Sequence, residues 1–141
     1  MRRWIEFDDE RCVWCRSCEL ICSLHHEGEC NPSLARIRIS LNLFEAEVEG
    51  HICRQCEEPK CLDACPVGAI QMNEEIGAYI IVEEKCVSCG LCAEACPYNA
   101  DGNVIFFNPA KKAYAKCDLC LGNPQCIEIC PSKALKLVVS R

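Results

Sequence analysis

The chain has 141 residues, and 17 of them, about 12 %, are cysteine, which exceeds the level typical of small folds built around their cysteines. Its length allows one domain or two very small ones with a modest apolar core, so ligated metal is expected to help hold it together. The net charge of -6 excludes the broad positive surface of a nucleic-acid-binding protein, and no apolar run approaches the ~18 residues that cross a bilayer.

The start of the chain does not read as an export signal, because Asp8, Asp9 and Glu10 stand where the apolar stretch of such a signal would lie. We therefore expect a cytoplasmic protein. Further along, polar and apolar residues alternate over residues 36–43, which predicts a half-buried strand. Residues 45–52 are expected to run back beside it.

Three copies of one structural unit follow in the rest of the chain. In each copy a cysteine-rich loop leads into a short helical turn, the turn ends at a proline, and a β-prone stretch comes after it. The turns are expected at residues 61–65, 91–96 and 125–130, and extended segments at residues 79–83, 104–107, 113–116 and 135–139. These elements predict an α+β fold of short helices and small antiparallel β-hairpins.

Sixteen of the cysteines fall into four groups of four. In chain order the groups are Cys12, Cys15, Cys18 and Cys22; Cys53, Cys56, Cys61 and Cys65; Cys86, Cys89, Cys92 and Cys96; and Cys117, Cys120, Cys126 and Cys130. Because a reducing cytosol keeps thiols free, this clustering indicates metal binding instead of a disulfide framework. Cys30 stands alone and is expected to be a small buried apolar residue.

The third group has the most specific motif in the chain. With Pro97 it reads C-x2-C-x2-C-x3-C-P, which is the run of bacterial [4Fe-4S] ferredoxins. Two intervening residues make a loop tight enough for three thiolates to reach three irons of one cube. In two-cluster ferredoxins the fourth cysteine binds the other cluster, so such motifs work in reciprocal pairs. Four groups therefore predict two pairs of clusters.

The other three groups vary this motif, and their spacing also allows a metal other than iron. Ser23 replaces the proline after the first group. The second and fourth groups have a longer second interval, and Pro66 and Pro131 follow their last cysteines. Pairs of the C-x2-C type also build tetrahedral zinc sites, so a zinc-binding structural module is an alternative. Four groups this dense would crowd zinc ions together, which favours iron–sulfur clusters. Since sixteen thiolates leave no iron open to a substrate, electron transfer is expected rather than catalysis.

The chain resembles the four-cluster ferredoxin-like electron-transfer subunits of the dimethyl sulfoxide reductase, formate dehydrogenase and hydrogenase small-subunit type. Residues 22–28, 31–38 and 53–66 are most similar to the iron-sulfur subunits that accompany tungsten-dependent aldehyde oxidoreductases and benzoyl-CoA reductases. This resemblance implies tandem bacterial-ferredoxin-like repeats in a single polyferredoxin domain over residues 1–141. An inner module, residues 52–108, would be nested between outer cluster-binding segments at residues 5–30 and 113–141.

The resemblance also implies which cysteines share a cluster, with groups two and three as an inner pair and groups one and four as an outer pair. The implied ligand sets are Cys53, Cys56, Cys61 and Cys96; Cys86, Cys89, Cys92 and Cys65; Cys12, Cys15, Cys18 and Cys130; and Cys117, Cys120, Cys126 and Cys22. A sequential pairing, group one with two and group three with four, stays open because ligand spacing alone does not exclude it.

The implied function is a non-catalytic subunit that relays electrons through four [4Fe-4S] clusters. One partner would be a larger catalytic oxidoreductase subunit with a tungsten- or molybdenum-pterin, nickel or flavin centre, and the other a ferredoxin or an NAD(P)H-linked flavoprotein. Self-association is left open, and a free-standing polyferredoxin shuttle is the alternative. The sequence has no G-x-G-x-x-G motif and no P-loop, so nucleotide chemistry would belong to partners. His25 and His26 are expected at the surface or at a helix end, not as ligands.

Overall fold

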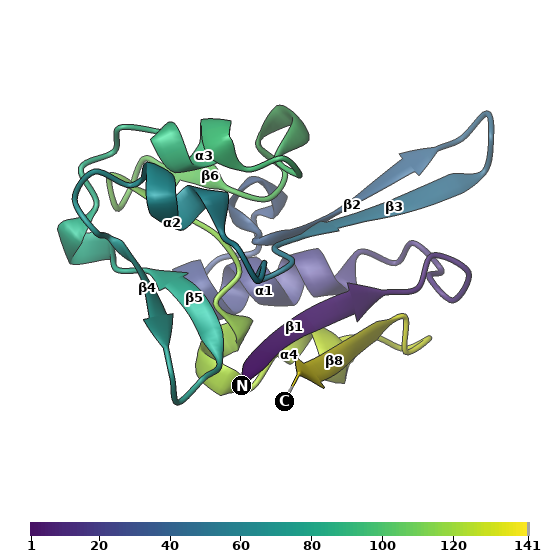
Figure 1. Ribbon diagram of the computed structural model, residues 1–141. Helices are drawn as coiled ribbons and strands as arrows, with labels where there is room; N and C mark the ends of the chain where they lie inside the picture. The colour runs from purple at the N-terminus through teal and green to yellow at the C-terminus, as the bar shows by residue number, and fades with distance from the viewer. Residues whose placement is uncertain (141) are drawn as a thin grey trace.

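Short helices and two-stranded antiparallel sheets alternate along residues 1–140, the part of the chain that the computed structural model describes (Figure 1). The strands are β1 (Arg2–Phe7), β2 (Ile37–Asn42), β3 (Glu47–Ile52), β4 (Ile70–Asn73), β5 (Ala78–Ile81), β6 (Phe106–Asn108), β7 (Ala113–Ala115) and β8 (Leu135–Ser140). The helices are α1 (Ser17–Glu27), α2 (Lys60–Ala64), α3 (Leu91–Ala95) and α4 (Gln125–Ile129). Single 3-10 turns lie at Pro32–Leu34, Glu83–Lys85, Ala100–Gly102 and Leu119–Gly122. The predicted α+β class is confirmed.

Three of the sheets are local hairpins, and the fourth joins the two ends of the chain. β2–β3, β4–β5 and β6–β7 each pair consecutive strands. The first and third of these hairpins are as the sequence predicts, whereas no strand was expected at β4. β1 pairs with β8, with Arg2 opposite Ser140 and Phe7 opposite Leu135, so both termini lie together (Figure 1). Strand β1 was not predicted, because its partner strand lies at the other end of the chain and residues 2–7 lack strict alternation.

One predicted strand begins later than expected. Residues 104 and 105 were expected to be extended strand, yet β6 starts at Phe106. The side chain of Asn99 explains the difference, since its Oδ1 accepts the backbone N–H of Val104 at 2.9 Å and that of Ile105 at 2.7 Å. These donors therefore find a side-chain acceptor in place of a neighbouring strand.

The eleven-residue helix α1 is the longest helix of the described residues, and it was not predicted from the sequence. The short helices end at cysteines that directly precede Pro66, Pro97 and Pro131, because a residue before proline disfavours helical dihedral angles. Ser23 follows the corresponding cysteine in α1, so the helix continues to Gly28, whose N–H bonds to the carbonyl of Leu24 at 3.0 Å.

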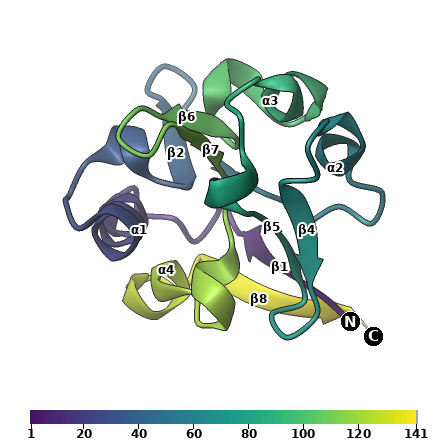
Figure 2. The same ribbon diagram turned by 90° about the vertical axis from the view of Figure 1, so that its left-hand side faces the viewer.

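The helices pack in two pairs, α1 against α4 and α2 against α3 (Figure 2). α1 also packs on β2, where the buried Glu19 carboxylate accepts the backbone N–H of Ile39 at 2.7 Å. Ile37, Ile105 and Leu119 are at most 1 % exposed and form the centre of the core. The core therefore connects segments that are far apart in sequence.

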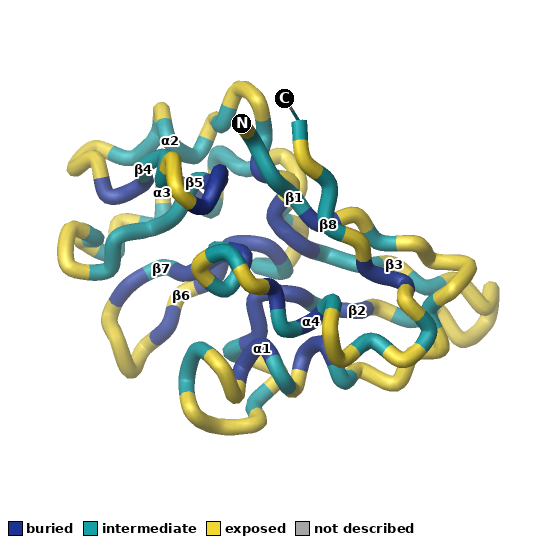
Figure 3. Tube along the Cα trace, turned by 90° about the horizontal axis from the view of Figure 1, so that it is seen from below, coloured by how far each residue is buried: buried dark blue, intermediate teal, exposed yellow. Residues whose placement is uncertain are grey.

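The β2–β3 hairpin extends away from this core, and the turn at its tip is exposed (Figure 3). Phe44 in that turn has no side-chain cover. No helix among the described residues is both long enough and apolar enough to cross a bilayer.

Candidate metal centre

Each helix carries the third cysteine of a group and brings it close to the fourth. Cys61, Cys92 and Cys126 lie in α2, α3 and α4, and the fourth cysteine of each group is the residue that ends the helix. In α1 the corresponding residues are Cys18 and Cys22, which share one face at i and i+4. None of the cysteines is in a disulfide, and the sixteen that belong to the four groups gather in four places.

The first place is a small apolar cavity of about 20 Å³ beside α3 and the β4–β5 hairpin. It is lined by four cysteines that we call the Cys86 set: Cys86, Cys89, Cys92 and Cys65. The Sγ of Cys65 accepts the backbone N–H of Ala69 at 3.3 Å. Burial favours the neutral thiol, but backbone N–H groups of residues 67–70 outweigh burial and hold the pKa of Cys65 below its ordinary value. This sulfur is therefore suited to be a thiolate ligand.

A second cavity, also of about 20 Å³, repeats this arrangement in the other half of the molecule. We call it the Cys12 set, and it is lined by Cys12, Cys15, Cys18 and Cys130. The Sγ of Cys130 accepts the N–H of Ala134 at 3.3 Å, the same four-residue step as in the first cavity. Against burial, these backbone donors and Ser132 lower the pKa of Cys130. Both cavities thus combine three cysteines of one group with the last cysteine of another.

The third place, the Cys53 set, holds Cys53, Cys56, Cys61 and Cys96. Burial raises the pKa of Cys61, and the nearby charges of Cys53 and Cys96 raise it further. The pKa of Cys96 is raised by burial and by the charges of Cys53 and Cys56. Thiols of the second and third groups therefore face one another.

The fourth place, the Cys117 set, holds Cys117, Cys120, Cys126 and Cys22. Burial raises the pKa of Cys120 to about 11 and the pKa of Cys117 and Cys126 above the ordinary value, and in all three the nearby charge of Cys22 adds to the increase. The Sγ of Cys22 accepts the backbone N–H of Arg36 at 3.2 Å. Thiols of the first and fourth groups therefore lie together.

Charges in neighbouring sets also influence one another. Burial raises the pKa of Cys92 to about 11, and the charge of Cys61 in the Cys53 set adds to it. Cys117 in turn has Cys53 among its neighbours, and Cys126 has Cys18. These influences link the Cys86 set to the Cys53 set, the Cys53 set to the Cys117 set, and the Cys117 set to the Cys12 set, a succession that we call the row.

The donor chemistry of these sets fits iron–sulfur clusters. Thiolates are the ligands that [4Fe-4S] clusters take, and hydrogen bonds to the sulfurs tune such centres. Backbone N–H groups reach the Sγ atoms of Cys12, Cys86 and Cys117 at 3.4, 3.5 and 3.4 Å. Cys30 lies outside the four sets in the turn after α1 and is exposed, so the expectation that it is buried was wrong.

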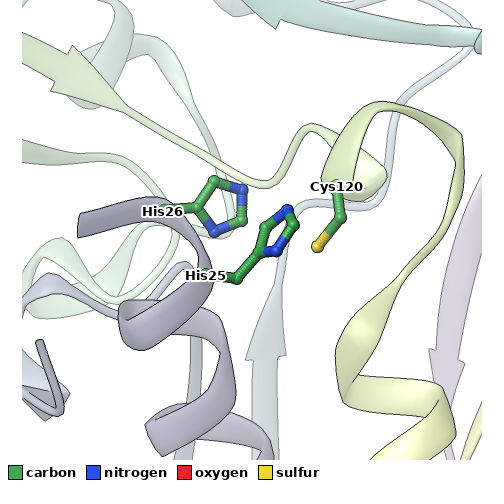
Figure 4. Close-up of side chains that lie close together, drawn as sticks. All are labelled: His25, His26 and Cys120. Atoms are coloured by element: carbon green, nitrogen blue, oxygen red, sulfur yellow. The ribbon is translucent and has the colours of Figure 1, made fainter. Parts of the chain in front are cut away.

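A different combination of ligands, His25, His26 and Cys120, gathers at the end of α1 (Figure 4). Both ring nitrogens of His26 are already engaged: Nδ1 lies 2.8 Å from the carbonyl of Cys22 and Nε2 lies 2.9 Å from a carboxylate oxygen of Asp118. Only His25 and Cys120 then remain as donors, fewer than the four ligands of a structural zinc site. His26 instead has the helix-end position that the sequence predicts.

Three buried polar residues near the sets were not found by the sequence analysis. Arg36, Gln55 and Lys116 are 8 %, 1 % and 2 % exposed. Gln55 donates from Nε2 to the carbonyl of Cys117 at 2.9 Å, and Arg36 donates from Nη1 to the carbonyl of Lys116 at 3.1 Å. Two of them could have been found from their positions in the sequence, since Gln55 lies within the second cysteine group and Lys116 directly precedes the fourth.

Comparisons with known proteins agree with this chemistry. Residues 44–140, which contain the second, third and fourth cysteine groups, match the family described as the 4Fe-4S dicluster domain. The chain is 43 % identical to the aliphatic sulfonate oxidoreductase, polyferredoxin-like subunit, of Pyrococcus furiosus, over 97 % of this chain and 78 % of that protein. It is 37 % identical to the putative electron transport protein YsaA of Escherichia coli, over 96 % of this chain and 89 % of that protein. Among solved structures, it is similar to the active site complex BamBC of benzoyl coenzyme A reductase, with 26 % identity, a TM-score of 0.56 and coverage of 96 % and 78 %.

Proposed function

The chain belongs to the 4Fe-4S dicluster domain family, and from this premise we propose that it relays electrons through four [4Fe-4S] clusters within a larger oxidoreductase complex. The family resemblance indicated by the cysteine motifs is confirmed, and so is the role of an iron–sulfur electron-transfer protein without substrate chemistry of its own. When bound, each cluster would accept and release single electrons. The family description names two clusters, and four is our proposal.

The number four rests on the cysteine sets. Each set supplies four thiols, which is the ligand count of one [4Fe-4S] cluster. The observation that carries the proposal is the pair of cavities, each lined by three cysteines of one group and one of another. This pattern supports the nested ligand assignment, with residues 52–108 as the inner module and residues 5–30 and 113–141 as the outer segments.

The order of the sets supports a relay with two ends. The Cys86 and Cys12 sets lie at the ends of the row, and each includes an exposed cysteine, Cys89 and Cys15. The two middle sets contain none. A partner docked at either end would therefore come close to a terminal cluster, while the cysteines of the middle sets are buried or half-buried.

The partners follow from the relatives. The P. furiosus relative is named as an oxidoreductase subunit, and the similar structure is described as an active site complex. We propose that one end of the row faces a larger catalytic subunit with a tungsten- or molybdenum-pterin, nickel or flavin centre. The other end would face a ferredoxin or an NAD(P)H-linked flavoprotein. A monomeric holoprotein that copurifies with no larger subunit would instead favour the free-standing shuttle.

Iron analysis of single-cysteine variants tests both the number of clusters and their ligands. Anaerobically prepared wild type should contain about sixteen irons per chain, because four clusters hold four irons each. Cys96→Ser should weaken the cluster of the Cys53 set, and Cys65→Ser that of the Cys86 set. Cys30→Ser, outside all four sets, is the matched control and should keep the full iron content. About eight irons in wild type, or loss of the Cys86-set signal in Cys96→Ser, would refute the proposal.

A further inference from the structure

Lys116 is a buried cation placed among the cysteines. It lies between β7 and Cys117, is 2 % exposed, and has one of the largest fully buried side chains of the described residues. Its Nζ lies 3.6 Å from the Sγ of Cys53 and donates to the carbonyl of Tyr79. Lysine is almost never fully buried unless it is paired, so this position calls for a partner charge.

That partner charge comes from thiols. Among residues 1–140, no carboxylate forms an ion pair with Lys116, whereas the buried Arg36 lies within 3.9 Å of the carboxylates of Glu27, Glu83 and Asp118. Burial raises the pKa of Cys61 and of Cys96, and the charge of Lys116 acts against burial at both thiols. The ammonium therefore faces three of the four members of the Cys53 set.

Neighbouring polar groups hold Lys116 in this place. Arg36 donates from Nη1 to the Lys116 carbonyl at 3.1 Å. Gln55 accepts the N–H of Tyr79 at 2.7 Å and donates to the carbonyl of Cys117 at 2.9 Å, so it fixes both the acceptor of the ammonium and the next residue along the chain. Since Lys116 is bonded directly to Cys117, it also links the two middle sets of the row.

We propose that Lys116 sets the reduction potential of the cluster held by the Cys53 set, making that cluster easier to reduce than the same four thiolates would without a buried cation. This inference rests on the proposed function. One electron from the redox partner takes the cluster with its four thiolates from a net charge of about -2 to about -3, with no bond made or broken. A fixed ammonium stabilises the more negative state of the cluster. An electron in the row is therefore more stable on the cluster of the Cys53 set than it would be without Lys116.

The expected size follows from the effect of one charge at this range. A single opposite charge within ~4–6 Å shifts a protonation equilibrium by about ten- to a thousandfold, and the added electron responds to the same field. Because the added electron is spread over the whole cluster, we expect an effect at the lower end of this range, about tenfold. Removing the charge should weaken one-electron reduction about tenfold, which corresponds to about 59 mV toward lower potential.

The test is a redox titration of the anaerobic holoprotein with dithionite, followed by electron paramagnetic resonance. The signal that disappears in Cys96→Ser identifies the cluster of the Cys53 set. Lys116→Met should make reduction of that cluster about tenfold less favourable, a shift of about 59 mV toward lower potential. Lys116→Arg keeps the positive charge and should therefore keep most of the wild-type potential. Lys136→Met, which removes an exposed lysine on β8, makes the same change in net charge and should leave the potential unchanged.

Two outcomes would overturn the proposal. One is a potential in Lys116→Met equal to that in Lys136→Met at full iron content. The other is a shift in Lys116→Arg as large as in Lys116→Met. If Lys116→Met loses iron, Lys116→Gln keeps a donor beside Cys53 without the charge and is measured in the same way. Failure of the four-cluster function is distinguishable, because it appears as low iron content in wild type.

Discussion

Replacing His26 with glutamine should destabilise the protein by removing the charged contact between α1 and the loop of the fourth cysteine group. Nε2 of His26 lies 2.9 Å from Oδ1 of Asp118, and the two side chains are only 9 % and 15 % exposed. Both ring nitrogens face acceptors, which is the pattern of a doubly protonated imidazolium. The same carboxylate accepts the N–H of Cys120 at 2.9 Å, so the contact also orders a candidate ligand loop.

The magnitude follows from the shifted pKa. Burial lowers the pKa of His26, but hydrogen bonds to Asp118 and Cys22 outweigh burial and raise it from 6.5 to about 9. A shift of about 2.5 units corresponds to about 3 kcal/mol, at ~1.36 kcal/mol per unit. Because the folded pKa is the higher one, this contribution is complete below pH 6.5 and is lost as the pH rises through about 9.

Asp118 limits the same contribution on the acid side. Burial favours its neutral form, but the contacts with His26 and Arg36 outweigh burial and lower its pKa from 3.8. Its contribution is therefore present above pH 3.8 and is lost as the pH falls through the folded value. The pair should stabilise the fold most between pH 3.8 and 6.5.

The assay is thermal unfolding of the holoprotein at one scan rate, across a pH series from about 6 to 10 that spans both pKa values of the imidazole. Near pH 6 the His26→Gln variant should unfold roughly 6–12 °C below wild type, and the gap should close as the pH approaches 10. His51→Gln, on the β2–β3 hairpin, removes an imidazole far from Asp118 and should follow the wild-type profile. Parallel profiles for wild type and His26→Gln over this range would refute the reasoning.

Three further predictions concern packing. Ile105→Ala removes a side chain that is 1 % exposed and should lower the free energy of unfolding by about 2–5 kcal/mol in denaturant titrations, and a loss under ~1 kcal/mol would contradict its place in the core. Gly50→Ala would put a Cβ 2.5 Å from Cγ of Phe7, so it should cost about 1–3 kcal/mol in the same titration, and a neutral effect would show that the ring moves freely. Phe44→Ser, at the exposed hairpin tip, should change the unfolding free energy by less than about 0.5 kcal/mol, and a larger loss would mean that the tip packs on the protein.

Local chemistry could be predicted from the sequence because it depends on neighbours along the chain. The spacing within Cys86–Cys96 brings thiols into one loop, and prolines such as Pro97 end the short helices wherever they follow the fourth cysteine. The β2–β3 and β6–β7 hairpins were predicted for the same reason, since their strands are consecutive. Helix α1 was missed because the signal that stops the other helices is absent after Cys22.

Long-range neighbours were decided only by the tertiary structure. The pairing of β1 with β8, the approach of Cys22 to Cys117 and the position of Lys116 against Cys53 all join residues far apart in sequence. Nothing in the spacing of one segment specifies which distant segment packs against it, because that choice depends on the burial and hydrogen bonding of the whole chain. The sequence by itself determined the kind of ligand, and the fold decided which thiols meet and which charge lies beside them.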